Sequence, residues 1–267
     1  MSIFNITSTT HLTRDGIKLA TDIYRPANDE GTPLPGKFPI VLLRTPYDRK
    51  NVRYRAAGAY WALNGYVFAI QDCRGRFDSE GEFVLLANEG PDGHDAIDWL
   101  ADQSYSNGKI GTYGTSYSAW VQNAAALERP EALSAMWVTQ GASNGATSSL
   151  RHNGVMELRW LTWAVTHGAV SPEALRDSAL QDELYQNGIN MYDWLKKLPW
   201  GIGSDETPLS GLPTYDEWAK DLYTHGDYDF DAGGYWAQKG LNFEPYYDIS
   251  LDIPTMYCGG WYDSYTR

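Results

Sequence analysis

The chain has 267 residues, of which 43% are hydrophobic and 21% charged, and these values are typical of a globular protein rather than a disordered, collagenous or disulfide-scaffold one. A formal net charge of −13 disfavours nucleic acid as a partner, because phosphate binding needs a basic face. No apolar run approaches the ~20 residues of a membrane span, so no membrane partner is expected.

Strand and helix patterns alternate through the first half of the chain. After a turn at residues 14–16, strand patterns occupy residues 18–25, 39–44, 66–71, 109–113 and 133–139. Helical patterns lie at residues 55–64, 91–102 and 117–128. Several of the strands are continuous apolar runs, as expected for strands covered on both faces. This alternation predicts an α/β fold with a mainly parallel sheet.

The pattern changes near residue 143. Residues 143–240 contain six of the eleven tryptophans, and the stretches 150–167 and 172–198 have helical spacing without strand alternation. A strand pattern returns at 253–258, shortly before the last residue. We therefore predict three parts: residues 1–142 form the first part of the core, residues 143–240 a helical insertion, and residues 241–267 the resumed core. The rest of the sheet is expected to lie outside this sequence.

Ser116 lies in a Gly-Thr-Ser-Tyr-Ser sequence at residues 114–118, between a predicted strand and a predicted helix. This approximates the G-x-S-x-G nucleophile elbow, with Ser118 in place of the final glycine. A serine on such a turn is raised above the sheet edge at a helix N-terminus, where the backbone N–H of Tyr117 could stabilise an oxyanion. The alternative is a tight strand–helix turn with a capping serine.

Asp263 follows the strand at 253–258 and a Gly-Gly pair, which is where the acid of a Ser–acid–His triad is expected. The alternative is a solvated turn aspartate. No histidine follows Asp263, and we do not expect any of the five present to serve as the base. They are His11, His94, His152, His167 and His225.

Four segments combine in one order: R-T-P-Y at 44–47, Q-D-C-R-G-R with S-E-G-E-F at 71–83, D-W-L to G-T-S-Y at 98–117, and G-W-Y-D at 260–263. Together they resemble the cocaine esterase / X-Pro dipeptidyl-peptidase family of α/β-hydrolases (the CocE/NonD type), across residues 12–267. The resemblance implies an α/β-hydrolase fold in which residues 143–240 form a helical cap over the pocket. Tryptophans of that segment could line an acyl pocket, but most of them are expected in its core.

The resemblance also implies roles for single residues. Ser116 would be the nucleophile and Asp263 the acid. Tyr47 would donate its phenol O–H to the oxyanion beside the Tyr117 backbone N–H. The alternative for Tyr47 is a packed loop aromatic. Three further motif residues are expected to brace loops by ion pairing rather than to contact substrate: Asp72, Arg74 and Arg76.

One departure from the family is serious. The family's base follows the acid loop in a segment that these 267 residues lack, so we interpret the sequence as the N-terminal part of such an enzyme. The predicted function is a serine hydrolase that cleaves an ester or amide, X-Pro peptide bonds included, through an acyl-enzyme. The chain by itself is expected to be inactive. The alternative is a truncated, non-catalytic binding or assembly module with a hydrolase fold.

Cofactors and location follow from what the sequence lacks. No His/Cys/Asp cluster has ligand spacing, so no metal or other cofactor is expected. The expected partner is a small-molecule ester or peptide substrate, and a homo-oligomer is left open. Cys73 and Cys258 lie in strand-like runs and are expected to be buried thiols in a reducing compartment. Because the first residues do not resemble a secretory signal, we expect a cytoplasmic protein.

Overall fold

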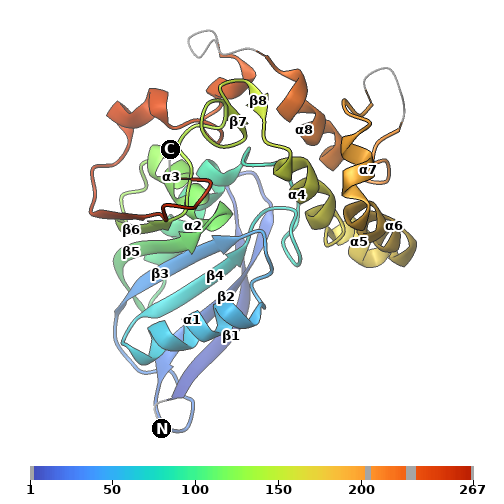
Figure 1. Ribbon diagram of the computed structural model, residues 1–267. Helices are drawn as coiled ribbons and strands as arrows, with labels where there is room; N and C mark the ends of the chain where they lie inside the picture. The colour runs from blue at the N-terminus through green and yellow to red at the C-terminus, as the bar shows by residue number, and fades with distance from the viewer. Residues whose placement is uncertain (1–2, 202–205, 227–232, 266–267) are drawn as a thin grey trace.

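The computed structural model describes residues 3–201, 206–226 and 233–265, and these residues build one seven-stranded sheet (Figure 1). In spatial order its strands are β1 (Ile3–Leu12), β2 (Lys18–Ala27), β4 (Val67–Asp72), β3 (Phe38–Thr45), β5 (Ser106–Thr115), β6 (Leu133–Thr139) and β9 (Thr255–Cys258). The pairings β1–β2 and β2–β4 are antiparallel, and the other four are parallel. The predicted mainly parallel sheet is therefore confirmed.

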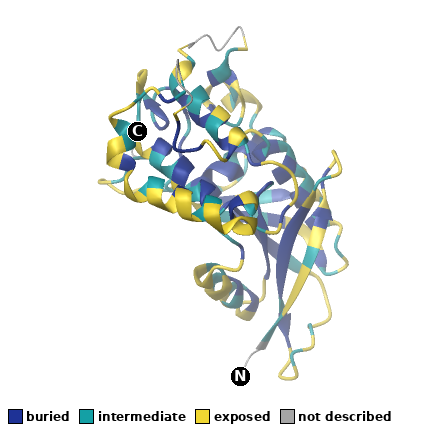
Figure 2. Cartoon of the chain, turned by 90° about the vertical axis from the view of Figure 1, so that its right-hand side faces the viewer, coloured by how far each residue is buried: buried dark blue, intermediate teal, exposed yellow. Residues whose placement is uncertain are grey.

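Helices cover both faces of the sheet. On one face α2 (Glu89–Ala101) and α3 (Tyr117–Leu127) pack together, and on the other lies α1 (Val52–Leu63). The apolar run of β3 explains this, because its successive side chains point to opposite faces. Ile40 and Leu42 join the core that contains residues of α2 and α3, whereas Val41 and Leu43 pack in the cluster that contains Ala62 of α1. The central strands are accordingly buried (Figure 2).

After β6 the chain leaves the sheet, and we call residues 143–240 the insertion. Its helices are α4 (Arg159–Gly168), α5 (Pro172–Arg176), α6 (Ser178–Ile189), α7 (Met191–Leu195) and α8 (Pro213–Thr224), and a 3-10 turn covers Tyr235–Ala237. A second 3-10 helix at Glu244–Ile249 leads back to β9. Four of the insertion's tryptophans are core residues, as expected: Trp160, Trp200, Trp218 and Trp236.

The first part of the insertion differs from the prediction. Residues 150–167 were expected to be helical throughout, but β7 (Arg151–His152) and β8 (Val155–Met156) form a short hairpin before α4. The turn residues Asn153 and Gly154 have φ values of 49° and 93°. A two-residue turn with both φ values positive favours Asn-Gly and matches the twist of paired strands. The Asn-Gly pair was the local signal for this hairpin.

The two cysteines have different environments. Cys73 is buried, as predicted, but Cys258 is only partly buried. The prediction was wrong for Cys258 because β9 is the outermost strand of the described sheet and has a neighbour on one side only. Within the described parts of the chain, no helix is both long and apolar enough to cross a membrane.

Candidate active site

Ser116 joins β5 to α3 with a strained backbone, at φ 61° and ψ −125°. A non-glycine residue with this conformation is uncommon and costs free energy, and such residues concentrate at functional sites. The neighbouring glycine is sterically required, because a Cβ on Gly114 would lie 2.4 Å from the backbone oxygen of Ser118. Ser118, which stands where the elbow pattern has glycine, is buried at this crossing without preventing the turn.

Tyr47 reaches Ser116 from the loop that follows β3. Its Oη lies 3.5 Å from Ser116 Oγ, which is long for a hydroxyl hydrogen bond but common for catalytic pairs before substrate binds. Burial raises the pKa of the Tyr47 phenol to about 12, although hydrogen bonding with Ser116 and Trp163 acts in the opposite direction. The phenol is therefore protonated at neutral pH and able to donate a hydrogen bond.

Buried ion pairs anchor the loop of Tyr47. The Arg49 backbone N–H donates to Asp72 Oδ1 at 2.7 Å, and Arg49 Nη1 donates to Asp72 Oδ2 at 2.6 Å. Arg49 Nε also donates to Asp22 on β2. Burial raises the pKa of Asp72 to about 6, against the opposing effect of the Arg49 guanidinium. The expected bracing role is thus confirmed for Asp72.

The bracing prediction holds for one of the two other motif residues. Arg74 pairs with Asp15 at 2.6 Å and with Asp92 at 2.5 Å, so it links the β1–β2 turn to α2. Arg76 instead has no ion pair with any described residue, and the prediction was wrong for it. Its side chain is completely buried against the insertion. There its guanidinium donates to uncharged oxygens, which are two backbone carbonyl oxygens and the Tyr215 hydroxyl.

The side chain of Tyr117 fixes the start of α3. Its phenol donates to Glu89 Oε1 at 2.8 Å and accepts from the Leu86 N–H at 3.1 Å. Glu89 in turn pairs with Arg44 at 2.8 Å, and all three side chains are buried. The Tyr117 backbone N–H belongs to the first turn of α3, where amides lack partners within the helix. This amide and the Tyr47 phenol are both available to an oxyanion beside Ser116.

A cavity of ≈ 330 Å³ opens at Ser116, and α4 supplies most of its other walls. The residues that line it are Ser116, Arg159, Trp160, Thr162, Trp163, Thr166 and Tyr265. Trp163 is stacked on Tyr117, with ring centroids 6.0 Å apart, and on His167, with centroids 3.9 Å apart. The insertion therefore shapes the space in front of the candidate nucleophile.

Asp263 does not line this cavity, whereas Tyr265, two residues further on, does. The Asp263 carboxylate accepts a hydrogen bond from the Tyr265 backbone N–H at 2.9 Å. The Tyr265 ring lies below the Arg159 guanidinium, 4.9 Å from its centre, and Tyr265 lines the same cavity as Ser116. The structure thus brings Ser116, Tyr47 and Tyr117 together with Tyr265, which the sequence analysis missed. The role of Asp263 as the acid stays a prediction.

His167 is the histidine that packs on Tyr47, with ring centroids 5.4 Å apart. Its Nδ1 lies 2.9 Å from the Trp163 carbonyl oxygen, so this nitrogen is engaged within α4. Burial, and then the nearby Arg76 charge, lowers the pKa of His167 to about 4. The neutral ring serves as a wall beside Tyr47, and no histidine is assigned as the base.

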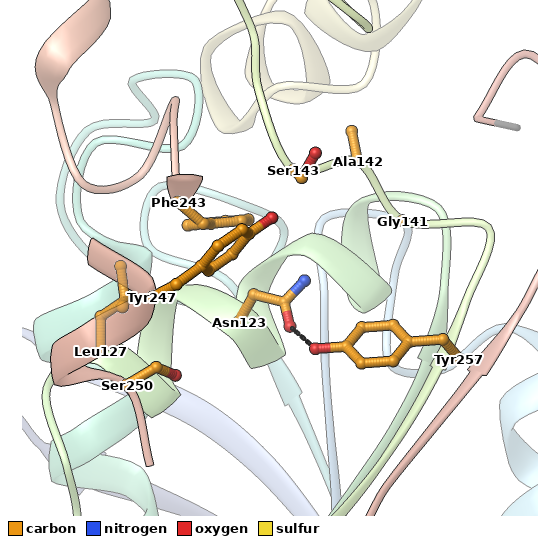
Figure 3. A pocket seen from close by; sticks show the side chains of 9 residues that line it. All are labelled: Asn123, Leu127, Gly141, Ala142, Ser143, Phe243, Tyr247, Ser250 and Tyr257. Carbon is orange, nitrogen blue, oxygen red and sulfur yellow. Dashed lines mark hydrogen bonds between the residues drawn. The ribbon is translucent and has the colours of Figure 1, made fainter. Parts of the chain in front are cut away.

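A second cavity of ≈ 320 Å³ lies along α3, between the loop after β6, the 3-10 helix at 244–249 and β9 (Figure 3). Tyr257 of β9 crosses one side of it and donates to Asn123 Oδ1 at 3.2 Å. None of the candidate site residues lines this cavity. The candidate nucleophile Ser116 instead lines the cavity formed with α4.

Comparisons with known proteins show the family and the fold of this chain. The X-Pro dipeptidyl-peptidase (S15) family profile matches residues 15–267. Cocaine esterase from Rhodococcus sp. is 33% identical over 166 residues, which are 61% of this chain and 26% of that protein. A CocE/NonD family hydrolase from Staphylococcus aureus has a TM-score of 0.54 at 29% identity, covering 61% of this chain and 32% of its own.

An aminopeptidase from a marine sediment archaeon (Thaumarchaeota archaeon) shares the fold over 96% of this chain, with a TM-score of 0.66 at 21% identity. The match covers 43% of the archaeal chain, so this sequence spans well under two thirds of each of these relatives. Since the family profile matches nearly every residue, the chain belongs to the X-Pro dipeptidyl-peptidase (S15) family, a family of α/β-hydrolases.

Proposed function

We propose that this chain is the nucleophile-bearing part of a serine hydrolase that cleaves an ester or amide through an acyl-enzyme. One observation supports this most directly. Ser116 has a strained strand-to-helix conformation, and a buried phenol lies 3.5 Å from its hydroxyl at the wall of a cavity. A capping serine in an ordinary turn would need neither the strain nor the phenol.

In the proposed mechanism Ser116 Oγ attacks the substrate carbonyl, whose oxygen gains negative charge. Tyr47 O–H and the Tyr117 N–H donate hydrogen bonds to that oxygen, and they do so more strongly in the transition state than in the ground state. Water then releases the acyl group. Asp263 is proposed to orient an imidazole base supplied from outside these 267 residues.

The roles of the larger segments are part of the same proposal. Residues 1–142 and 241–267 would form the hydrolase core, and the insertion would be the cap over Ser116. The contact of α4 with the cavity supports this division. The proposal includes both ester and peptide substrates, and the cytoplasmic location stays a prediction.

The test is hydrolysis of p-nitrophenyl acetate by a chain extended beyond residue 267 to include a histidine that can act as base. Ser116→Ala should remove nearly all turnover and leave the far-ultraviolet circular dichroism unchanged. Ser118→Ala is the matched control, because Ser118 is a buried serine two residues away. Equal turnover by Ser116→Ala and the parent would overturn the assignment. Absence of turnover in the extended parent would favour the non-catalytic binding module.

A further inference from the structure

Arg76 follows β4 and has no exposed surface. Its Nε donates to the Pro46 carbonyl oxygen at 3.0 Å. Its Nη1 donates to the His167 carbonyl oxygen at 2.9 Å and also to the Tyr215 hydroxyl. These acceptors belong to three segments that are distant in sequence: the loop of Tyr47, the end of α4, and α8. One side chain therefore joins the core to two helices of the insertion.

A buried guanidinium without a carboxylate is costly, because its hydration is lost and no counter-charge replaces it. The buried Arg44 and Arg49 avoid this cost by pairing with Glu89 and Asp72. Arg76 has no such partner among the described residues, and its Nη2 has no hydrogen-bond acceptor there. The rings of Phe77 and Phe83 lie 5.1 Å and 5.4 Å from its charged centre. Stability alone gives no reason for a cation at this position.

The positions of the acceptors supply a reason. Pro46 directly precedes Tyr47, so the bond to its carbonyl oxygen fixes the backbone that carries the phenol. On the insertion side, α4 carries Trp163 and His167, whose rings pack on Tyr47 with centroids 6.5 Å and 5.4 Å away. The guanidinium thus spans the two halves of the environment that holds Tyr47 opposite Ser116.

We propose that Arg76 is a positioning residue that couples the seating of α4 and α8 to the placement of the Tyr47 hydroxyl. The kinetic side of this proposal rests on the proposed function, whereas the mechanical coupling does not. Lysine cannot substitute, because a planar guanidinium donates in several fixed directions at once and an ammonium group does not hold this geometry.

Hydrogen exchange followed by mass spectrometry tests the coupling in the 267-residue chain itself. Arg76→Met and Tyr215→Phe should both speed exchange of the amides at residues 45–51. Tyr215→Phe keeps the ring on α8 and removes one acceptor, so its effect on the Tyr47 loop must pass through Arg76. Unchanged exchange at 45–51 in Tyr215→Phe would overturn the coupling.

Arg151→Met is the matched control. Arg151 is a buried arginine whose Nε also bonds α8, at the Leu222 carbonyl oxygen, from within the insertion. Its loss should leave exchange at 45–51 at the parent rate. Equal acceleration in Arg151→Met would mean that any loosening of the insertion disturbs the loop, and would overturn the specific role of Arg76.

Kinetics in the extended, active chain provide the second readout. Arg76→Lys and Arg76→Met should lower kcat for p-nitrophenyl acetate by about 10²-fold, the cost of a misplacement of roughly 1 Å, with a much smaller change in KM. An unchanged kcat would overturn the positioning role. If the extended parent shows no turnover, the proposed function fails, and the exchange result alone decides the role of Arg76.

Discussion

Two phenols and one backbone amide belong to the site of Ser116: the Tyr47 phenol lies 3.5 Å from its hydroxyl, Tyr265 lines the same cavity, and the Tyr117 amide starts α3. Burial raises the pKa of each phenol near Ser116, so neither loses its proton at neutral pH. A neutral donor that is already in place can stabilise a developing oxyanion without the reorganisation that water would need. Tyr47 is the better candidate, because Arg49 and Arg76 fix its loop on both sides.

Tyr47→Phe is expected to lower kcat of the extended chain by about 10²–10³-fold, the usual effect of losing one oxyanion donor. KM should change much less, because the phenol acts mainly in the transition state. Tyr54→Phe is the control: its phenol accepts from Thr45 Oγ1 in the same region and does not line the cavity. Steady-state kinetics with p-nitrophenyl acetate check this, and a kcat within a few-fold of the parent would leave Tyr47 as a packing residue.

His11 gives a pH dependence of stability. It is buried on β1 against Trp99, and burial, followed by the Arg44 charge, lowers its pKa to about 4 from the usual 6.5. As the pH falls, His11 therefore binds a proton near pH 6.5 in the unfolded chain but only near pH 4 in the folded chain. The stabilisation is complete above pH 6.5 and is lost as the pH falls towards 4.

The expected measurement is urea unfolding at pH 7 and pH 4.5. The linkage relation gives a loss of roughly 2 to 3 kcal/mol from His11 across this interval. His11→Gln should remove that part of the difference between the two pH values, whatever its effect at pH 7. Equal differences for the variant and the parent would show that His11 does not carry the dependence.

At the scale of elements, the strand-to-helix turn depends on close contact between β5 and α3. Gly114→Ala would place a Cβ 2.4 Å from the Ser118 backbone oxygen, and a backbone atom at a helix start cannot move away cheaply. We expect a loss of about 1–3 kcal/mol in the free energy of unfolding, or more, as for other overpacked sites.

Gly111→Ala is the matched control in the same strand. A Cβ at Gly111 would find its nearest neighbour at 3.7 Å, an ordinary contact. Denaturant unfolding should give Gly114→Ala a clearly lower free energy of unfolding than Gly111→Ala. Similar stabilities for the two variants would contradict the steric account of the elbow.

The core elements could be predicted from the sequence because their apolar runs are long and local. The apolar run at 39–44 predicted the strand that is β3 in the structure, and the helical pattern at 117–128 predicted α3. The β7–β8 hairpin was missed because two residues per strand leave no alternation to detect, only an Asn-Gly turn.

The residues of the site also differ in whether a local sequence pattern identifies them. Ser116 has a local motif, but Tyr265 and Trp163 become site residues only when the 260–265 loop and α4 meet across some 100 residues of sequence. The hydrogen bonds of Arg76 could not be predicted for the same reason, because its acceptors lie up to 139 residues away. Tertiary contact, rather than composition, decided these roles.

At the scale of the whole molecule, the described sheet has two contrasting edges. β1 at one edge carries mainly polar side chains, such as Thr7 and Ser8, whose hydroxyls donate to Asn5 and Asp22. β9 at the other edge pairs, among the described strands, only with β6. Its side chains Met256 and Tyr257 are 59% and 68% exposed, and Trp261 just beyond is 96% exposed. The second edge therefore concentrates unpaired backbone groups and apolar surface in one place.

We predict that the 267-residue chain self-associates through β9. An edge strand that offers unpaired N–H and C=O groups is a template for pairing with another chain, and charged side chains are the usual protection. No charged residue lies between residues 253 and 262. The net charge of −13 opposes association at long range, but salt screens charges beyond a Debye length of about 10 Å at 0.1 M ionic strength, and no local charge repels at the edge itself. Size-exclusion chromatography at rising protein concentration should show species larger than a monomer. Met256→Lys places a charge on this exposed position and should shift those species towards the monomer.

Leu12→Lys, an equally exposed position on β1, is the control and should leave the profile unchanged. A parent chain that stays monomeric at all concentrations would contradict the prediction, and an equal response to Leu12→Lys would assign the association to surface hydrophobicity in general rather than to the β9 edge.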